Sequence, residues 1–320
     1  MTATTPLSSH RPAVGVVGGG RWGYALACAA RRVGHPVVLH SRRDNAPEAD
    51  ARGIEVVRDP SALAERCTLV LVAAPSEAMR AVARSLGDVL DGSHLVVHGT
   101  RGLSPEGLNT LSDVIRAETP CRRVGALGGP VLADDLIDGR PAVIAVASRY
   151  AEVSAAVEAG LGGPMLRVSR SPDLVGLEWA SALNGCLFVA LGYARAIGVS
   201  PGLLGGLLTR GLHEAARVAI AAGADERTFF SLVGIGELLA AMDQDDRPEC
   251  RLGAALGRGE SLEAAQAHAA MRVEALSLLP RVVDFARERR VEATLLGTIA
   301  QALEGTMSPQ EILVLLMTRR

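Results

Sequence analysis

The sequence predicts a doubly wound α/β domain with a mostly parallel sheet, followed by an all-α domain. Short β-branched runs alternate with helical stretches up to residue 168, a glycine-rich run follows the first of them, and every later periodic segment is helical. A turn at Ser171-Pro172 marks the expected junction. We therefore expect two domains, residues 12–171 and 172–320.

The bulk composition is typical of a folded globular protein of two domains. The chain has 320 residues, of which 48% are hydrophobic and 21% charged. A net charge of −2 attracts neither nucleic acid nor an anionic membrane, and we find no apolar run of about 18 residues that could span a bilayer. The five scattered cysteines form no CxxC pair and the N-terminal residues lack an apolar leader, so we expect a cytoplasmic protein without a metal site.

The first half begins with an expected strand at residues 14–17 and a helix at 23–33, which Gly34 closes. The later runs are rich in Val, Ile and Leu and are separated mostly by amphipathic segments, which is the order that parallel strands with crossover helices require. The further strands are expected at residues 36–40, 54–57, 69–73, 95–98, 124–127, 142–147 and 165–168.

The second half shows apolar residues at helical spacing and no strand pattern. The expected helical segments are residues 174–197, 201–222, 225–242, 262–289 and 309–317.

A GxGxxG motif lies between the first strand and the first helix, which is the context that dinucleotide binding requires. Gly18 permits the tight turn, Gly20 lets the backbone approach a pyrophosphate, and Gly23 allows close helix packing. The helix N-terminus supplies amide donors to the anion. Arg21 and Trp22, inside the motif, are expected to contact the cofactor; the alternative is a glycine turn without a ligand.

The end of the second strand favours NADP(H) over NAD(H), although NAD(H) stays possible. NAD-binding proteins place a carboxylate there, whereas this chain has Ser41, Arg42 and Arg43 before its first carboxylate, Asp44. Guanidinium groups suit the extra phosphate of NADP, unless both arginines are merely solvated. Pro75, after the fourth strand, completes the expected cofactor contacts.

Six segments in order resemble the bacterial glycerol-3-phosphate dehydrogenase family over nearly the whole chain. The resemblance implies a Rossmann domain, a helical substrate domain with the active site between them, a homodimer formed through the helical domain, and reduction of dihydroxyacetone phosphate with NAD(P)H. The matching segments are GGGRWGYALA at 18–27, VAAPSEAMR at 72–80, HGTRGL at 98–103, GGPVLADDL at 128–136, TRGL at 209–212 and GIGEL at 234–238.

The chain departs from this family where the chemistry is expected. The family's TKGL lysine corresponds to Arg101, and its second lysine, the usual proton donor, falls on Asn184. An amide has no titratable proton near neutral pH, although its NH2 group can hydrogen-bond a substrate oxygen. The family aspartate of GLGDL becomes Glu237. We expect Arg101 to hold an anion or polarise an oxygen, Asn184 to orient the substrate, and Glu237 to act as acid or base unless it only pairs within the helical domain.

The phosphate-binding stretch has also changed. The family's Arg-Asn pair falls on Pro248 and Glu249, among several carboxylates. Each carboxylate repels a phosphate charge by about 1 kcal/mol at ~4 Å in water, and by more away from water. Arg247 or Arg251 could replace the family's arginine if the alignment shifts by one residue. For Arg210, a structural ion pair is favoured over a contact with the substrate. The expected substrate-binding residues are Gly129, Arg210, Arg247 and Arg251.

These changes lead to the hypothesis that the chain is an NAD(P)H-dependent oxidoreductase with an altered substrate, a small carbonyl or imine. Two alternatives stay open: the family reaction with Arg101 and Arg247 binding the phosphate, and a dinucleotide-binding protein without catalysis. His98, at the end of a strand, is a weaker proton-relay candidate, with a satisfied strand-end histidine as the alternative. His94 lies four residues before it, too far along a strand to share a metal.

Overall fold

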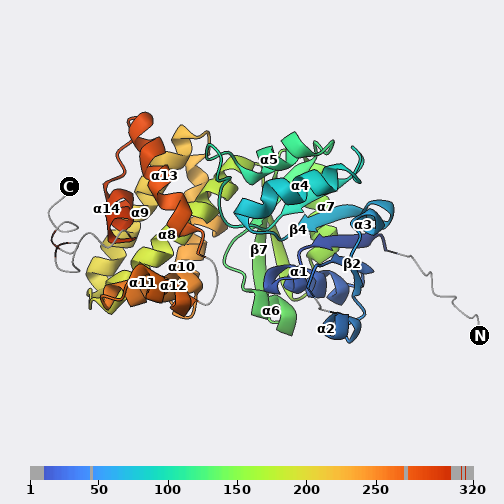
Figure 1. Cartoon of the computed structure of the whole chain (residues 1–320), viewed down its shortest axis with the longest axis horizontal. Helices are drawn as coiled ribbons and strands as arrows, with labels where there is room; N and C mark the ends of the chain where they lie inside the picture. The colour runs from blue at the N-terminus through green and yellow to red at the C-terminus, as the bar shows by residue number, and fades with distance from the viewer. Residues whose placement is uncertain (1–10, 44–45, 270–272, 304–310, 312–313, 315–320) are drawn as a thin grey trace, which may run out of the picture.

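The computed structural model describes residues 11–43, 46–269, 273–303, 311 and 314. The α/β domain and the helical domain lie side by side, with the described parts of the chain well separated into the two (Figure 1). Hydrogen bonds that join them include those of Glu274 with Ser76, of Arg281 with the Ser104 carbonyl at 2.6 Å, and of His98 with Glu178 at 3.0 Å.

One eight-stranded sheet forms the core of the first domain, in the order β3-β2-β1-β4-β5-β6-β7-β8. Only β6 and β7 pair antiparallel, so the prediction of a doubly wound, mostly parallel sheet is confirmed. The strands are β1 (Ala13–Val17), β2 (Val37–His40), β3 (Glu55–Val57), β4 (Cys67–Val72), β5 (Leu95–His98), β6 (Val124–Gly128), β7 (Ala142–Ser148) and β8 (Leu166–Ser171).

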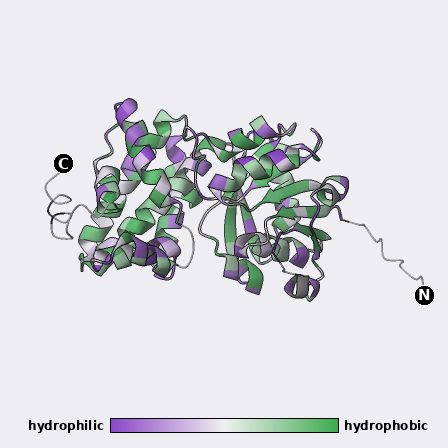
Figure 2. Cartoon of the chain, viewed as in Figure 1, coloured by the Kyte–Doolittle hydropathy of each residue, from purple (hydrophilic) through white to green (hydrophobic). Residues whose placement is uncertain are grey.

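Helices cover both faces of this sheet, because successive strand residues point to opposite faces. Leu71 and Val97 pack under α1, α6 and α7, whereas Val70 and Val96 pack under α3, α4 and α5. The strands are mainly hydrophobic, and hydrophilic residues gather on the outer helices (Figure 2). The helices are α1 (Arg21–Arg32), α2 (Ala46–Asp50), α3 (Ser61–Arg66), α4 (Met79–Gly87) after a 3-10 turn η1 (Ser76–Ala78), α5 (Leu111–Glu118), α6 (Ala133–Asp138) and α7 (Ala151–Leu161).

The helical domain is built around α8 (Leu174–Ala196), which is almost wholly buried. Within the described residues, α8 is the one helix long and apolar enough to cross a membrane, and 89% of that apolar window is packed inside the protein. Its apolar character is therefore that of a core helix. The surrounding elements are α9 (Pro201–Ala221), η2 (Glu226–Phe230), η3 (Leu232–Gly236), α10 (Glu237–Ala241), α11 (Pro248–Gly257), α12 (Leu262–Ala269), α13 (Ala275–Glu288) and α14 (Thr294–Leu303).

Several expected helix boundaries were wrong. Residues 225–242 form a 3-10 turn, one wide π turn and a short helix, because Gly234 packs so tightly that a Cβ there would lie 2.1 Å from the Phe229 carbonyl oxygen. The segment expected as helix at 262–289 is two helices, and α11 and α14 were not predicted. Strand β8 continues to Ser171 by pairing with β7. Apart from residues 311 and 314, the expected helix at 309–317 lies outside the described residues.

Candidate active site between the two domains

The glycine loop after β1 has the geometry that a dinucleotide needs. Gly18 has φ +114°, and a Cβ there would lie 2.3 Å from the Ala73 carbonyl oxygen; a Cβ on Gly23 would lie 1.9 Å from the Gly18 oxygen. A Cβ on Gly20, by contrast, would meet nothing within 4 Å. Gly20 is the N-cap of α1 and contributes no side-chain cap. The loop thus leaves an open approach to the helix amides, and these residues fit a pyrophosphate.

Trp22 links this loop to the segment that follows β5. Its Nε1 would lie 2.4 Å from a Cβ on Gly99, so the indole packs directly against that glycine. Nε1 is buried and has no hydrogen-bond partner among the described residues. Pro75 precedes η1, where Glu274 of the helical domain accepts a hydrogen bond from the Ser76 backbone at 3.1 Å. The expected nucleotide contacts therefore lie beside the domain interface.

At the end of β2, the Ser41 side chain accepts a hydrogen bond from the Arg43 backbone at 3.0 Å, and Arg58 donates to the Ser41 carbonyl at 2.9 Å. Arg42 and Arg43 are exposed, as a site for an additional phosphate requires. Arg21 is also exposed, and its guanidinium pairs with Asp134 of α6. The Arg21 side chain thus bridges two helices of the α/β domain.

A largely buried cluster of charges begins two residues beyond Gly99, at Arg101. We call it the quartet: Arg101, Glu237, Arg247 and Glu249. Arg101 donates to Glu249 at 3.0 Å through Nη1 and to Glu237 through Nη2. The guanidinium groups of Arg101 and Arg247 lie 5.3 Å and 4.8 Å from the ring centre of Phe188. Two guanidinium groups and two carboxylates sum to zero charge.

Asn184 joins the quartet from α8. It is fully buried, and its Nδ2 donates to the backbone oxygens of Val233 at 2.8 Å and Gly234 at 3.0 Å and to Glu237 Oε2 at 3.3 Å. The amide thereby ties α8 to the wide turn η3 and to α10. Its Oδ1 has no partner among the described residues.

Gly185 makes room for the arginine at position 101. A Cβ on Gly185 would lie 3.2 Å from Cδ of Arg101 and 4.0 Å from Glu249. A larger residue at 185 would push the arginine stem away from α8, so the residues at positions 101 and 185 are sterically matched.

Burial and pairing act on the ionisable groups of the quartet in different ways. Burial raises the pKa of the Glu237 carboxyl, against the opposing effect of Arg101 and Arg247. The pKa of Arg101 is raised because Glu237 and Glu249 outweigh its burial. Burial, followed by the neighbouring Arg101, lowers the pKa of Arg247. Arg101 therefore stays charged at every physiological pH, and burial makes the Glu237 carboxyl easier to protonate than an ordinary glutamate.

Other expected site residues lie elsewhere. Arg251 is exposed in a shallow groove with Arg258 and His268, and Arg210 pairs at 3.3 Å with Glu214, which accepts the backbone amides at the start of α14. Gly129, after β6, has φ +106°. These placements give Arg210 a structural contact and separate Arg251 from the quartet's inner side chains.

His98 is held at the end of β5 by the buried carboxylate of Glu178, which also binds the backbone and hydroxyl of Ser112 at 2.9 and 2.6 Å. His98 Nδ1 has no partner among the described residues. His94 contacts the Ala64 carbonyl at 3.0 Å and lies at the other end of the strand. His98 thus makes a hydrogen bond between the two domains. This contact resembles the second alternative, a strand-end histidine with a structural partner, more than a proton relay.

Sequence reasoning missed Phe188 and Gly185 as parts of this site, and it did not predict that Glu249 pairs with Arg101. Phe188 lies one turn after Asn184 on α8, so helical spacing could have placed it on the same face. The pairing of Glu249 with Arg101 joins residues 148 positions apart and had no local signal.

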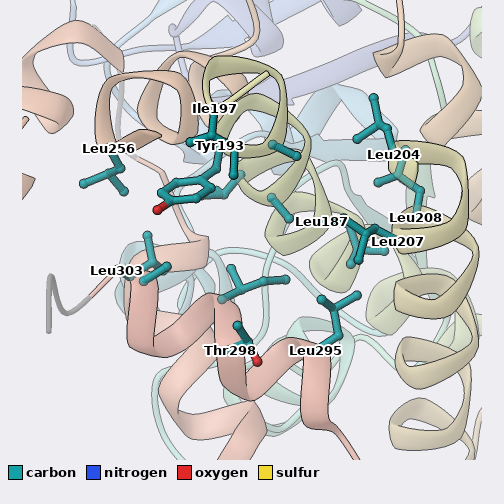
Figure 3. Close-up of a pocket in the computed structure, with 15 residues that line it drawn as sticks. Leu187, Tyr193, Ile197, Leu204, Leu207, Leu208, Leu256, Leu295, Thr298 and Leu303 are labelled. Carbon is teal, nitrogen blue, oxygen red and sulfur yellow. The ribbon is translucent and has the colours of Figure 1, made fainter. Parts of the chain in front are cut away.

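The enclosed apolar cavity of the helical domain lies away from this chemistry. Side chains of α8, α9 and α14 converge on it, including Leu187, Leu204 and Leu295, and Tyr193 also lines it (Figure 3). Its volume is about 40 Å³ and no charged side chain lines it. Ligand pockets are commonly about 300–1,000 Å³, so this cavity is small for a substrate.

Comparison with known proteins covers almost the whole chain. Residues 49–154 match the N-terminal and residues 173–314 the C-terminal model of NAD-dependent glycerol-3-phosphate dehydrogenase. The chain is 31% identical to a glycerol-3-phosphate dehydrogenase [NAD(P)+] of Alkalilimnicola ehrlichii, covering 97% of this chain and 98% of that protein. For the protein of the same name from Thioalkalivibrio sulfidiphilus, the identity is 32% over 92% and 93% of the two chains.

Solved structures agree with these matches. The crystal structure of glycerol-3-phosphate dehydrogenase from Coxiella burnetii superposes with a TM-score of 0.89 at 26% identity, over 97% of this chain and 100% of that one. The Plasmodium falciparum enzyme, at 12% identity, shares the fold with a TM-score of 0.86 over 97% and 96% of the two chains. Sequence models, relatives and fold thus agree, and the chain belongs to the NAD-dependent glycerol-3-phosphate dehydrogenase family.

Proposed function

We propose that this protein is an NAD(P)H-dependent oxidoreductase that delivers hydride to a small carbonyl or imine carbon, and that its substrate is no longer a triose phosphate. The observation that carries the altered substrate is the double pairing of Arg101 with Glu237 and Glu249. Two carboxylates already offset the positive charge of this arginine, so its net attraction for a phosphate is weak. The open glycine loop supports retention of the cofactor.

The residues of the site would have different roles, which follow from their positions. When bound, the nicotinamide cofactor supplies the hydride. Gly18, Gly20 and the first amides of α1 would hold the pyrophosphate of the cofactor. Trp22, which packs against Gly99, would lie against the nicotinamide ring. Glu237 would lie near the substrate as a carboxylate base, whose affinity for a proton is increased because burial raises its pKa, and Arg101 would fix the orientation of that carboxylate.

A phosphate dianion is poorly matched to the quartet, which has no net charge. Each phosphate charge would be attracted by Arg101 and Arg247 and repelled by Glu237 and Glu249, and each such pair is worth about 1 kcal/mol at ~4 Å in water. The rival, in which both arginines bind the phosphate, requires Arg101 to leave its carboxylate partners. A cofactor-binding protein without catalysis is the other rival, and it predicts tight NAD(P)H binding without turnover.

Restoring the family's residues tests the altered substrate. The variant Arg101→Lys/Asn184→Lys/Glu249→Asn should turn over dihydroxyacetone phosphate at least ~10-fold faster than the wild type, because removing one carboxylate and adding one ammonium makes the site net positive. Activity is followed by NADPH oxidation, with the matched surface variant Arg66→Lys as control. No gain in a folded, NADPH-binding triple variant would count against loss of these residues as the cause.

We further infer that NADP(H) is preferred, with Arg42 and Arg43 binding the additional phosphate. The variant Arg42→Ser/Arg43→Ser should raise the Kd for NADPH about 10- to 100-fold, since charge-assisted hydrogen bonds contribute about 1.5–3 kcal/mol. The Kd for NADH should change less than ~2-fold, because NADH lacks that phosphate. Fluorescence titration measures both constants, and an equal loss for the two cofactors would contradict this assignment.

We also infer a cytoplasmic homodimer formed through the helical domain. Five cysteines that are all unpaired and buried suit a reducing compartment. Phe230, Ile235 and Leu239 lie on the consecutive segments η2, η3 and α10, and their side chains are 56%, 39% and 64% exposed. Apolar side chains gathered on one segment are typical of a protein interface.

Light scattering should give twice the 33.3 kDa chain mass for the wild type, and Leu239→Glu should shift the equilibrium to the monomer because it places a charge in the interface. Met165→Glu, on an exposed apolar residue of the α/β domain, is the matched control and should leave the dimer intact. A monomeric wild type at ~50 µM, above the Kd of ordinary weak dimers, would contradict the inference.

A further inference from the structure

Buried polar atoms of Asn184, Arg247 and Arg101 have no hydrogen-bond partner among the described residues, and together they call for both a donor and an acceptor on a ligand. Oδ1 of Asn184 is an acceptor on a side chain that is 0% exposed, and Nη2 of Arg247 is a donor on a side chain that is 6% exposed. Buried polar groups of native proteins are nearly always hydrogen-bonded. Unpaired atoms of both kinds, on residues of one contact network around Glu237 and Phe188, point to a bound molecule that satisfies them.

The orientation of the Asn184 amide is fixed by its surroundings. Nδ2 contacts two backbone carbonyl oxygens and a carboxylate oxygen of Glu237, which can only accept a hydrogen bond from it. The nitrogen must therefore lie on that side, and the unpaired atom is the oxygen. Asn184 cannot donate to a substrate carbonyl; it can accept from an N–H or O–H group.

Arg247 provides an unpaired donor, which complements the unpaired acceptor of Asn184. Its Nε donates to the Gln244 side chain and its guanidinium lies over Phe188, whereas Nη2 has no partner in the part of the chain that the structure describes. Nε of Arg101, whose guanidinium lies near the same ring, also has no partner within the described ranges. Carboxylate and phosphate oxygens are the acceptors that a guanidinium binds most strongly.

The net charge of the quartet limits the chemical class of the ligand. A zero-charge quartet accepts a zwitterion without repulsion, and a 2-amino acid carries an N–H donor on the carbon next to its carboxylate. Its oxidised form, the 2-iminium acid, keeps the N–H donor. A 2-hydroxy acid loses its O–H donor on oxidation, so it would satisfy Asn184 in one redox state only.

We propose, on the basis of the function above, that the substrate pair is a small 2-amino acid and its 2-imino acid, with the carboxylate on Arg247 and the nitrogen donating to Asn184 Oδ1. In the reducing direction a hydride adds to the iminium carbon, the C=N π electrons become the nitrogen lone pair, and the cofactor is oxidised. A protonated imine needs no further proton for this step. The absence of an acid at position 184 is therefore compatible with imine reduction, whereas reduction of a carbonyl requires a proton for its oxygen.

Calorimetry on the protein saturated with NADP⁺ tests this proposal. Alanine and 2-aminobutyrate are titrated beside lactate and 2-hydroxybutyrate, which share their carbon skeletons, and beside glycerol 3-phosphate. We expect at least one amino acid to bind ~10-fold more tightly than its hydroxy counterpart and than glycerol 3-phosphate. The same amino acid should support reduction of NADP⁺.

Variants then localise the site. Arg247→Met and Asn184→Leu should each weaken amino-acid binding at least ~10-fold while NADP⁺ still binds, and Arg247→Lys should retain part of the affinity. Arg251→Met, on the exposed side of the same helix, is the matched control and should bind like the wild type. Melting curves identify any variant that fails to fold, in which case Arg247→Lys carries the test.

Two negative results are distinguishable. If NADP⁺ binds but no amino acid does, or if the hydroxy acid binds equally well, the substrate assignment is overturned and the oxidoreductase proposal stands. If NADP⁺ itself does not bind, the proposed function fails, and the substrate assignment fails with it.

Discussion

Replacing Arg101 by methionine should lower the free energy of unfolding by about 3 kcal/mol at pH 7.5. The substitution leaves Glu237, which is 0% exposed, as a buried carboxylate without its main counter-charge, and it also unpairs Glu249. Removing one partner of a buried ion pair costs about 3–5 kcal/mol. We expect the lower end, because the Arg101 side chain is 27% exposed and water reaches part of it. Urea denaturation followed by circular dichroism measures the loss.

The stability that Arg101→Met loses should depend on pH. Without the guanidinium, the Glu237 carboxyl has a folded-state pKa further above its unfolded value of about 4.3. The contribution of such a group is fully present below the unfolded pKa and is lost as the pH rises through the folded pKa. The deficit of Arg101→Met relative to wild type should therefore shrink below about pH 4 and grow toward pH 8.

A second substitution separates this effect from lost packing. Arg101→Met/Glu237→Leu should recover about half of the stability or more, because no buried carboxylate remains at position 237. Arg66→Met, which breaks the exposed pair with Glu55, should cost no more than about 1 kcal/mol. Equal losses for Arg101→Met and Arg66→Met would show that the quartet contributes no buried-charge energy.

Gly20→Val should raise the Kd for NADPH at least ~100-fold while leaving the fold intact. A Cβ at Gly20 meets no atom of the protein within 4 Å, and φ −76° and ψ 174° suit valine. The added side chain would occupy the space through which a pyrophosphate approaches the amides of α1. The loss of one anion-binding site of this kind corresponds to about 3 kcal/mol or more. Fluorescence titration with NADPH measures the change.

The melting temperature controls for folding. Valine at an N-cap is disfavoured relative to glycine by about 1 kcal/mol or less, so Gly20→Val should melt within a few degrees of the wild type. Gly206→Val, on α9, also meets open space and is the matched control for cofactor affinity. If Gly20→Val binds NADPH normally, the glycine loop is not the pyrophosphate site.

The fold was largely predictable from the sequence because its signals are local. Each strand is a short run such as Leu95–His98, and the glycine motif lies between β1 and α1. The errors fall where long-range packing decides. The wide turn η3 depends on Gly234 packing against the Phe229 carbonyl, and helical periodicity alone gave a continuous helix there. Strand β8 is longer than expected because β7 pairs with it along its full length.

The candidate site could be predicted only in part. The positions of Arg101, Asn184 and Glu237 followed from a motif resemblance, and the structure brings all three into contact. Their hydrogen-bond roles did not follow, because the acceptors that bind the Asn184 amide lie 49 to 53 positions away along the chain. The sequence thus singled out the three positions, and only the fold could show that the Asn184 oxygen is the unpaired atom.

The most direct test of an altered substrate on a retained cofactor site is the rate of NADPH oxidation by the purified wild-type protein. Dihydroxyacetone phosphate is compared with unphosphorylated 2-oxo acids plus ammonia and with preformed cyclic imino acids. We predict that an unphosphorylated substrate is reduced with a kcat/KM at least ~100-fold above that for dihydroxyacetone phosphate. Turnover of dihydroxyacetone phosphate with a kcat/KM of ordinary enzymes, about 10⁴ M⁻¹s⁻¹ or more, would contradict the account.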